Sequence, residues 1–228
     1  HDALPIYEAF LAGLSQGLFA LADAHGIELV GGDTTAGPLS LCITVMGEVP
    51  PGQALLRSGA KVGDTLWVSG RLGDARLALE AFRGTISLPA DAFERCRLAM
   101  ECPQPRVALG LALRGLATAA IDVSDGLLGD LGHILKASGC GAEIAIDSVA
   151  ACAIFHWAEH GFDINYCREM TAAGGDDYEL VFTAPPAARE AITQAAASSA
   201  TLVSRIGHIT AERALVMSDA KGVQVANT

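Results

Sequence analysis

Residues 121–126 read Ile121-Asp122-Val123-Ser124-Asp125-Gly126, an apolar strand end that runs into two carboxylates, a hydroxyl and a glycine. The pattern predicts a strand, a glycine turn and then a helix. Two carboxylates about 4 Å apart repel by roughly 4 kcal/mol at an effective dielectric near 20, so such a pair needs a cation or a shared proton. Mg²⁺ prefers oxygen ligands of this kind. Ser124 or Asp125 could instead cap the helix that begins near Leu127, so this stretch alone leaves both interpretations open.

Two further motifs place acids beside glycines. One is Gly31-Gly32-Asp33-Thr34-Thr35, which follows a predicted strand at residues 27–30. The other is Gly174-Gly175-Asp176-Asp177-Tyr178-Glu179, which leads into a predicted strand at residues 180–183. Glycines let the backbone approach a ligand closely and expose its N–H groups. Each motif alone could be an ordinary turn, but their joint occurrence with residues 122–126 favours a site for a metal and phosphate.

Phosphate binding in this chain would have to work without a P-loop, because the G-x-x-x-x-G-K-[ST] spacing is absent. Arg57 lies in a turn-rich segment, where its guanidinium could clamp a phosphate with two hydrogen bonds or could simply be solvated. In phosphoryl transfer the protein mainly positions groups and neutralises charge, so a strong general base is not required. His156 and His160 are spaced like zinc ligands in a predicted helix at residues 152–160, but no third ligand follows, so we do not predict a zinc site.

The spacing of apolar residues predicts two domains. Residues 6–24 have the period of an amphipathic helix, and residues 39–49 alternate as a long strand that needs a partner from elsewhere. The segment after Pro50 is rich in turn residues. We therefore expect a first domain at residues 1–51, a linker at 52–63 and a second domain at 64–228. Further strands are expected in the second domain at 65–69, 119–123, 142–146, 201–206 and 214–217.

The composition excludes several classes of protein. With 228 residues, 51% of them hydrophobic and only 18% charged, the chain is typical of a globular α/β or α+β protein. A net charge of −11 argues against a nucleic acid partner. No segment has the length and purity of a membrane span. The six cysteines contain no C-x-x-C pair, which favours a reducing cytoplasmic location.

Four motifs in order resemble the thiamine-monophosphate kinase family over nearly the whole chain. Two of them are the glycine-acid motifs at residues 31–35 and 174–180, and a third is the stretch at 121–126. The fourth is Leu56-Arg57-Ser58-Gly59-Ala60-Lys61-Val62-Gly63-Asp64. This family belongs to the superfamily of aminoimidazole ribonucleotide synthetase, selenophosphate synthetase and HypE. The resemblance implies a Mg²⁺-dependent transfer of the γ-phosphoryl group from ATP to thiamine monophosphate.

The resemblance also implies a fold and the roles of particular residues. The expected fold is PurM-like, α/β plus α+β, with an N-terminal domain whose sheet pairs with that of a second subunit in a homodimer. The implied metal ligands are Asp33, Asp122 and Asp125. The implied ATP contacts are Gly32, Asp33, Arg57 and Ser124, and Asp176 would contact the thiamine substrate. No residue is expected to act as a chemical catalyst other than by positioning and by metal electrostatics.

Some features of the family pattern are missing from this chain. Family members begin with a further segment that carries another metal-binding acid motif, and they end in a tail with an aromatic substrate contact. This chain begins at His1, and it has Ala36 where relatives often carry Arg. We therefore expect a fragment with an incomplete N-terminal domain and doubtful activity by itself. The alternatives are another ATP-dependent enzyme of the superfamily and a non-catalytic nucleotide-binding or dimerisation fragment.

Overall fold

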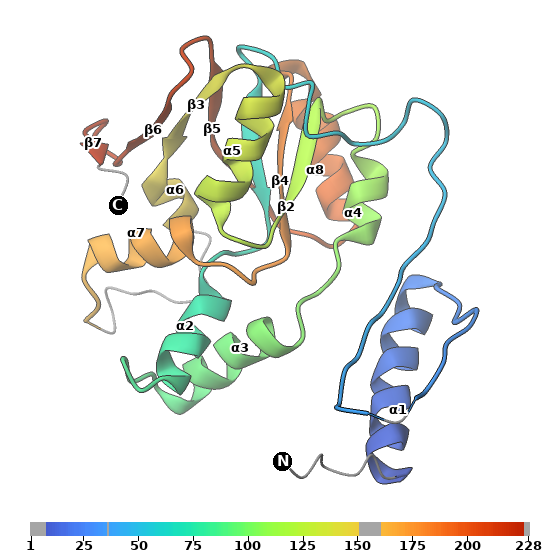
Figure 1. Ribbon diagram of the computed structural model, residues 1–228. Coiled ribbons are helices and arrows are strands. Elements are labelled where there is room, and N and C mark those ends of the chain that lie inside the picture. Colours follow the sequence, from blue (N-terminus) through green and yellow to red (C-terminus); the bar gives the residue numbers. More distant parts are fainter. Residues whose placement is uncertain (1–7, 36, 151–160, 226–228) are drawn as a thin grey trace. The chain divides into compact units, whose positions relative to one another are not determined.

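A computed structural model describes the chain except residues 1–7, 36, 151–160 and 226–228 (Figure 1). The chain divides into two compact units, His1–Val49 and Pro50–Thr228. No helix in the described part of the chain is long and apolar enough to cross a membrane. The predicted helix at residues 152–160 lies outside the described residues.

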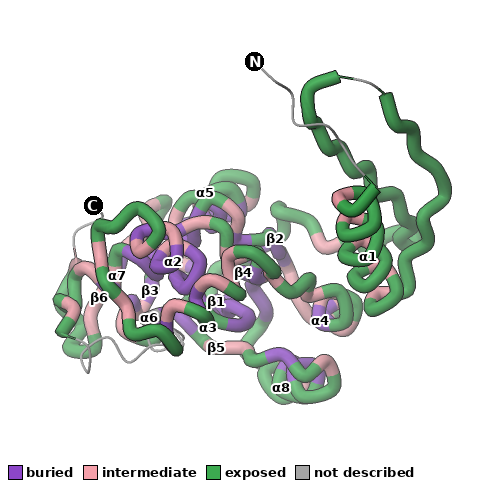
Figure 2. The backbone as a smooth tube through the Cα atoms, turned by 90° about the horizontal axis from the view of Figure 1, so that it is seen from below, coloured by how far each residue is buried: buried purple, intermediate pink, exposed green. Residues whose placement is uncertain are grey.

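The first unit contains one long helix, α1, at Glu8–His25. The chain leaves this helix through Gly26, whose positive φ of 64° suits a glycine at a helix end. The helix predicted at residues 6–24 is therefore confirmed over its described part. None of its residues is buried, and Figure 2 shows most of the unit as exposed.

The strands predicted at residues 27–30 and 39–49 do not form, so both predictions were wrong for this chain. Alternation correctly indicates a segment with two unlike faces, but a strand also needs a neighbour for its N–H and C=O groups. The described residues of the first unit contain no other strand to supply one. The apolar side chains remain in water, with Ile43 71% and Val45 72% exposed.

The second unit is built on a seven-stranded sheet with the order β2-β4-β1-β5-β3-β6-β7 (Figure 1). Neighbouring strands are antiparallel except β3 and β6, which are parallel. Each strand that the sequence predicted for this unit is present. The strands are β1 Thr65–Ser69, β2 Ala119–Val123, β3 Gly141–Ala145, β4 Glu179–Ala184, β5 Val203–Thr210, β6 Leu215–Ser218 and β7 Gln224–Val225.

Helices connect these strands and cover the sheet. The helix predicted after Gly126 is α5, and it ends at Gly139 in a left-handed conformation. The helices of this unit are α2 Asp74–Phe82, α3 Ala90–Glu101, α4 Val107–Ala112, α5 Leu127–Ser138, α6 Ile146–Ala150, α7 Ile164–Ala173 and α8 Arg189–Ser198, with a 3₁₀ turn at Pro186–Ala188.

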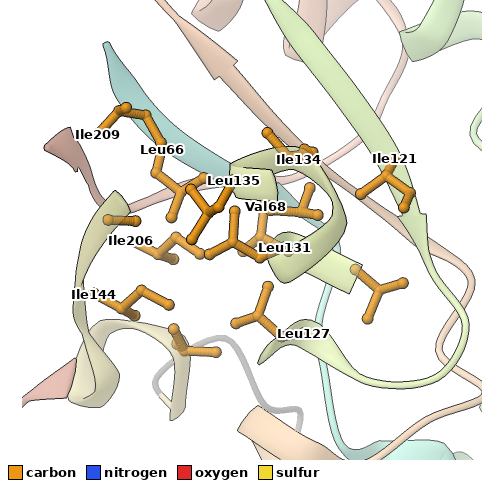
Figure 3. Close-up of a cluster of buried hydrophobic side chains, with 14 of the residues drawn as sticks. Leu66, Val68, Ile121, Leu127, Leu131, Ile134, Leu135, Ile144, Ile206 and Ile209 are labelled. Carbon is orange, nitrogen blue, oxygen red and sulfur yellow. The ribbon is translucent and has the colours of Figure 1, made fainter. Parts of the chain in front are cut away.

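Alternating side chains of the strands build a core on each face of the sheet. Leu66 and Val68 of β1 pack with Leu131 of α5 in the largest cluster (Figure 3). Trp67 points to the opposite face, where it joins Phe182 and residues of α4 and α8. Burying one such large apolar side chain contributes roughly 1.5–3 kcal/mol. The strand β2 and the helix α5, which precede and follow the turn at residues 124–126, are therefore both fixed by buried side chains.

Candidate active site

The backbone of the turn between β2 and α5 is hydrogen-bonded to a buried carboxylate. The Ser124 and Asp125 N–H groups both donate to Asp130 Oδ2, over 2.9 and 3.0 Å. Asp130 is only 3% exposed. Because its oxygen satisfies the turn backbone, the side chains of Asp122 and Asp125 are left at the surface and that of Ser124 is partly exposed.

This arrangement rules out the helix-cap interpretation of the turn. The N-cap position of α5 is Gly126, and the structure shows no side-chain cap bond there for this described helix. The hydroxyl of Ser124 and the carboxylate of Asp125 are thus not used as caps. The cap interpretation of these side chains was therefore wrong, and a ligand-binding role for them stays a prediction.

Gly126 is required by a close approach of two loops. Its φ is 117°, and a Cβ there would lie 3.0 Å from the carbonyl oxygens of Ala173 and Gly174. We expect Gly126→Ala to destabilise the protein by about 1–3 kcal/mol, because the backbone conformation and the contact both oppose a side chain. Chemical denaturation measures this. Gly129→Ala in the same helix has open space around its Cβ and should be neutral or stabilising; equal losses from the two variants would contradict the prediction.

The acidic loop that precedes β4 is fastened to this turn by backbone hydrogen bonds. Asp176 N–H donates to the Ser124 carbonyl over 2.9 Å, and Tyr178 N–H donates to the Val123 carbonyl over 2.8 Å. Asp176 and Tyr178 have positive φ values of 65° and 51°, which are costly for residues with side chains. The loop therefore holds Asp176 at the same edge of the sheet as Asp122 and Asp125.

The carboxylates at this edge act together on one phenol. The pKa of Tyr178 is raised, first by the charge of Asp176, then by burial, and further by Asp122 and Asp125. The Tyr178 hydroxyl also lies 3.4 Å from Asp176 Oδ1. Three carboxylates from two segments that are distant in sequence thus concentrate negative charge at one place. Such a place favours a cation or the positive part of a ligand.

Asp177 points away from this edge and bonds to the start of α2. Gly73 N–H donates to both carboxylate oxygens of Asp177, over 3.0 and 3.1 Å. The pKa of Asp177 is raised well above its usual range, mainly by burial and also by the charges of Asp74 and Glu179. The carboxylate links the acidic loop to the segment between β1 and α2.

The raised pKa of Asp177 predicts a pH dependence of stability. A carboxyl whose pKa is higher in the folded state contributes stability below its unfolded value of about 3.9, and this is lost as the pH rises through the folded value. We expect the melting temperature of Asp177→Asn, relative to the wild type, to increase as the pH is raised from about 4. Asp91 has a lowered pKa because of Arg95, so the contribution of its carboxylate changes only below about pH 4, and Asp91→Asn should show a nearly flat curve above that pH. Parallel curves for both variants would contradict the assignment.

Glu179 anchors the loop in the interior. Its side chain is 7% exposed and forms a two-pronged ion pair with Arg106, with Arg106 Nε 2.7 Å from Glu179 Oε2. Ser69 Oγ donates to the same oxygen over 2.5 Å. A Cβ at Gly70 would lie 1.8 Å from Glu179 Oε1, so only glycine leaves room for this carboxylate. The ion pair fixes the point at which the acidic loop enters β4.

The structure brings together four of the predicted site residues and separates others. Ser124 and the three carboxylates at residues 122, 125 and 176 share one edge of the second unit. Arg57 belongs to the same unit, but its carbonyl accepts a hydrogen bond from Ser138 at the far end of α5 from Asp125. A helix of 12 residues is about 18 Å long. Gly32 and Asp33 belong to the first unit, so a common site with them stays a prediction.

The residues present fit part of a magnesium site. Within the described ranges there is no group of three or more His, Cys, Asp or Glu side chains that could hold a metal ion. Asp122 and Asp125 nevertheless present two exposed carboxylates at one turn. Mg²⁺ often uses one or two carboxylates and completes its shell with water and phosphate oxygens. The donor set is therefore that of a hard cation, with Asp33 as the predicted further ligand.

Sequence reasoning did not assign a role to several residues that shape this site. Asp130 and Asp177 act through backbone N–H groups, and Tyr178 lies among the carboxylates. Asp177 and Tyr178 stood inside a motif that the sequence had already singled out. Asp130 carried a weaker signal, an acid in the first turn of α5, where the helix dipole favours negative charge.

Comparison with known proteins first defines the class. Residues 61–219 match the family described as "AIR synthase related protein, C-terminal domain". The structure is also similar to that of AaThiL complexed with AMPPCP and TMP, with a TM-score of 0.74 and 20% identity over all of this chain and 69% of that chain. The chain therefore has an α/β fold of the PurM-like class.

Nearer relatives define the family within this class. A solved thiamine-monophosphate kinase from Stenotrophomonas maltophilia is 43% identical, with a TM-score of 0.86, over 93% of this chain and 68% of that chain. The thiamine-monophosphate kinase of Salmonella typhimurium is 41% identical over 90% of this chain. The chain spans 62% of the length of that relative. The chain belongs to the thiamine-monophosphate kinase family.

Proposed function

We propose that the protein carrying this chain transfers the γ-phosphoryl group of ATP to thiamine monophosphate, giving thiamine diphosphate and ADP. The observation that carries this proposal is the similarity to the Stenotrophomonas maltophilia kinase in both sequence and structure. The edge of the second unit that carries Asp122, Asp125 and Asp176, called here the carboxylate edge, supports the proposal. This edge offers oxygen ligands and a place for a cationic substrate.

The proposed roles are those that the family resemblance implies, and the shared position of Asp122, Ser124, Asp125 and Asp176 in the second unit supports them. Asp122 and Asp125, together with Asp33, would hold Mg²⁺, which when bound neutralises phosphate charge. Ser124 presents its hydroxyl beside these carboxylates, as an ATP contact would require. Asp176, held by the Ser124 carbonyl on the same edge, would contact the thiamine substrate. Gly32 and Arg57 complete the proposed set of ATP contacts.

The chemistry needs little more than positioning. The accepting group is a phosphate oxygen, which is already largely deprotonated at neutral pH, so no residue has to remove a proton from it. We propose a direct in-line transfer, in which the chain aligns the two phosphates and excludes side reactions. The two fastened loops suit this task, because they hold Asp125 and Asp176 in fixed relation to each other.

We also propose a homodimer and a cytoplasmic location. The exposed apolar residues at 39–49 have the alternation of a strand and lack a partner in the described part of their unit. Pairing with a strand from a second copy would bury them. The cytoplasmic proposal rests on the six cysteines without a C-x-x-C pair, a pattern that fits a reducing compartment.

An acceptor panel tests the proposed reaction. The purified full-length protein is incubated with Mg-ATP and one acceptor in each reaction, which is thiamine monophosphate, thiamine or another phosphorylated metabolite. The amounts of ADP and of phosphorylated product are then measured. We expect one thiamine diphosphate for each ADP formed. Turnover of a different acceptor alone would favour another enzyme of the superfamily. Binding of Mg-ATP without any product would favour a non-catalytic role.

A further inference from the structure

Two carboxylates support the backbone of the proposed site, one of them buried (Asp130) and the other half-buried (Asp177). Asp130 lies in the first turn of α5 and is 3% exposed. Asp177 lies in the acidic loop, and burial is the main cause of its raised pKa. Each accepts backbone N–H groups: Asp130 joins the first turn of α5 to the turn just before it, and Asp177 joins the acidic loop to Gly73, 104 positions away.

The two carboxylates hold different segments. Asp130 Oδ2 accepts the N–H groups of Ser124 and Asp125, the residues that would contact ATP and Mg²⁺. Asp177 accepts from Gly73, and it neighbours Asp176, which would contact the thiamine substrate. One carboxylate therefore orients the metal side of the edge, and the other orients the substrate side.

We propose that Asp130 and Asp177 are positioning residues with separate effects, Asp130 on metal binding and Asp177 on binding of thiamine monophosphate. The inference rests on the proposed function and gives each of the two carboxylates a separate effect on the proposed site. Neither residue needs to touch a ligand, because each acts through the backbone of the residues that do. A hydrogen-bond acceptor in the right place is the property that matters.

Leucine variants remove the acceptor and keep the branched shape of the side chain, with methyl groups in place of the two oxygens. We expect Asp130→Leu to raise the Mg²⁺ concentration for half-maximal activity by roughly 10–100-fold, as loss of a group that orients metal ligands does. Its KM for thiamine monophosphate should change by less than about threefold. Asp177→Leu should raise the KM for thiamine monophosphate by roughly 10-fold or more, because Asp176 is displaced. Its Mg²⁺ concentration for half-maximal activity should change little.

Asparagine variants provide the matched controls. Asp130→Asn and Asp177→Asn keep an acceptor oxygen in place, so each should restore most of the property that its leucine counterpart loses. Binding measured without turnover gives a second readout. Mn²⁺ binding, followed by its paramagnetic resonance signal, should weaken for Asp130→Leu alone, and equilibrium dialysis of thiamine monophosphate should show weaker binding for Asp177→Leu alone.

The outcomes separate this inference from the proposed function. If the wild-type protein forms no thiamine diphosphate, the proposed function fails first. If it does, equal losses of metal and substrate binding in both leucine variants, or no loss in either, would overturn the inference. Should a leucine variant not fold, the alanine variants at the same positions remove the acceptor without adding apolar bulk, and the same split is expected.

Discussion

Asp122→Asn and Asp125→Asn are each expected to lower the rate of thiamine diphosphate formation by roughly 100-fold or more. Both residues are exposed, Asp122 near the end of β2 and Asp125 in the turn that follows, where they would hold Mg²⁺ against the phosphates. Loss of one group that stabilises transition-state charge commonly costs 10²–10³-fold in rate, and a metal ligand belongs to the stronger cases. Steady-state kinetics of the full-length protein at saturating ATP would measure the effect.

Asp91→Asn is the control for this pair of variants. Asp91 is also an exposed carboxylate, but it lies in α3 and pairs with Arg95 at the surface. Removing it should leave the rate unchanged within about twofold, since exposed ion pairs contribute little. If Asp122→Asn retained nearly full activity at all Mg²⁺ concentrations, the carboxylate edge would not be the metal site.

Arg106→Leu is expected to destabilise the protein by about 3–5 kcal/mol, the second large effect. The variant leaves Glu179 buried without its partner, and breaking a buried ion pair from one side commonly has a cost of this size. The pKa of Arg106 is raised mainly by its hydrogen bonds to Glu179, which shows how closely the two groups interact. Urea denaturation would report the loss as a lower midpoint at unchanged slope.

The double variant Arg106→Leu with Glu179→Leu separates the ion pair from the shape of the site. Without either charge there is no unpaired buried group, so most of the lost stability should return. Ser69 Oγ would still accept the Leu180 N–H, which keeps β4 in place. A double variant less stable than Arg106→Leu alone would show that Glu179 matters for reasons other than its partner.

The second unit could be predicted from the sequence because its signals are local. The strand at 119–123, the glycine turn and the helix after Gly126 lie in one continuous stretch. Their strand and helix periods agree with the final packing, in which Val123 and Leu127 are both fully buried. The closeness of Asp122, Asp125 and Asp176 was also predictable in outline, because the motifs at residues 122–126 and 174–179 each adjoin a predicted strand.

The absence of the strand expected at residues 39–49 could not be predicted, because alternation states which side chains share a face and not whether a neighbouring strand exists. Side chains such as Leu41 and Ile43 satisfy the pattern and yet remain exposed. Backbone pairing is a property of two segments, and one sequence segment carries information about only one of them.

The supporting carboxylates were missed for a related reason. Asp130 and Asp177 look like ordinary helix and loop acids in the sequence. Their importance comes from backbone N–H groups that the fold brings to them, including Gly73, which lies 104 positions away from Asp177. Tertiary hydrogen bonds of this kind leave no periodic signal. The sequence therefore indicates the exposed ligands of the site more readily than the groups that hold them.

The most direct test of the proposed function is transfer of a radiolabelled γ-phosphoryl group from ATP. The full-length protein is supplied with Mg²⁺, labelled ATP and thiamine monophosphate, and the label is followed by chromatography. We expect labelled thiamine diphosphate from the wild-type protein and almost none from Asp122→Asn. Label that appears only as inorganic phosphate, or on thiamine diphosphate equally in both proteins, would contradict it.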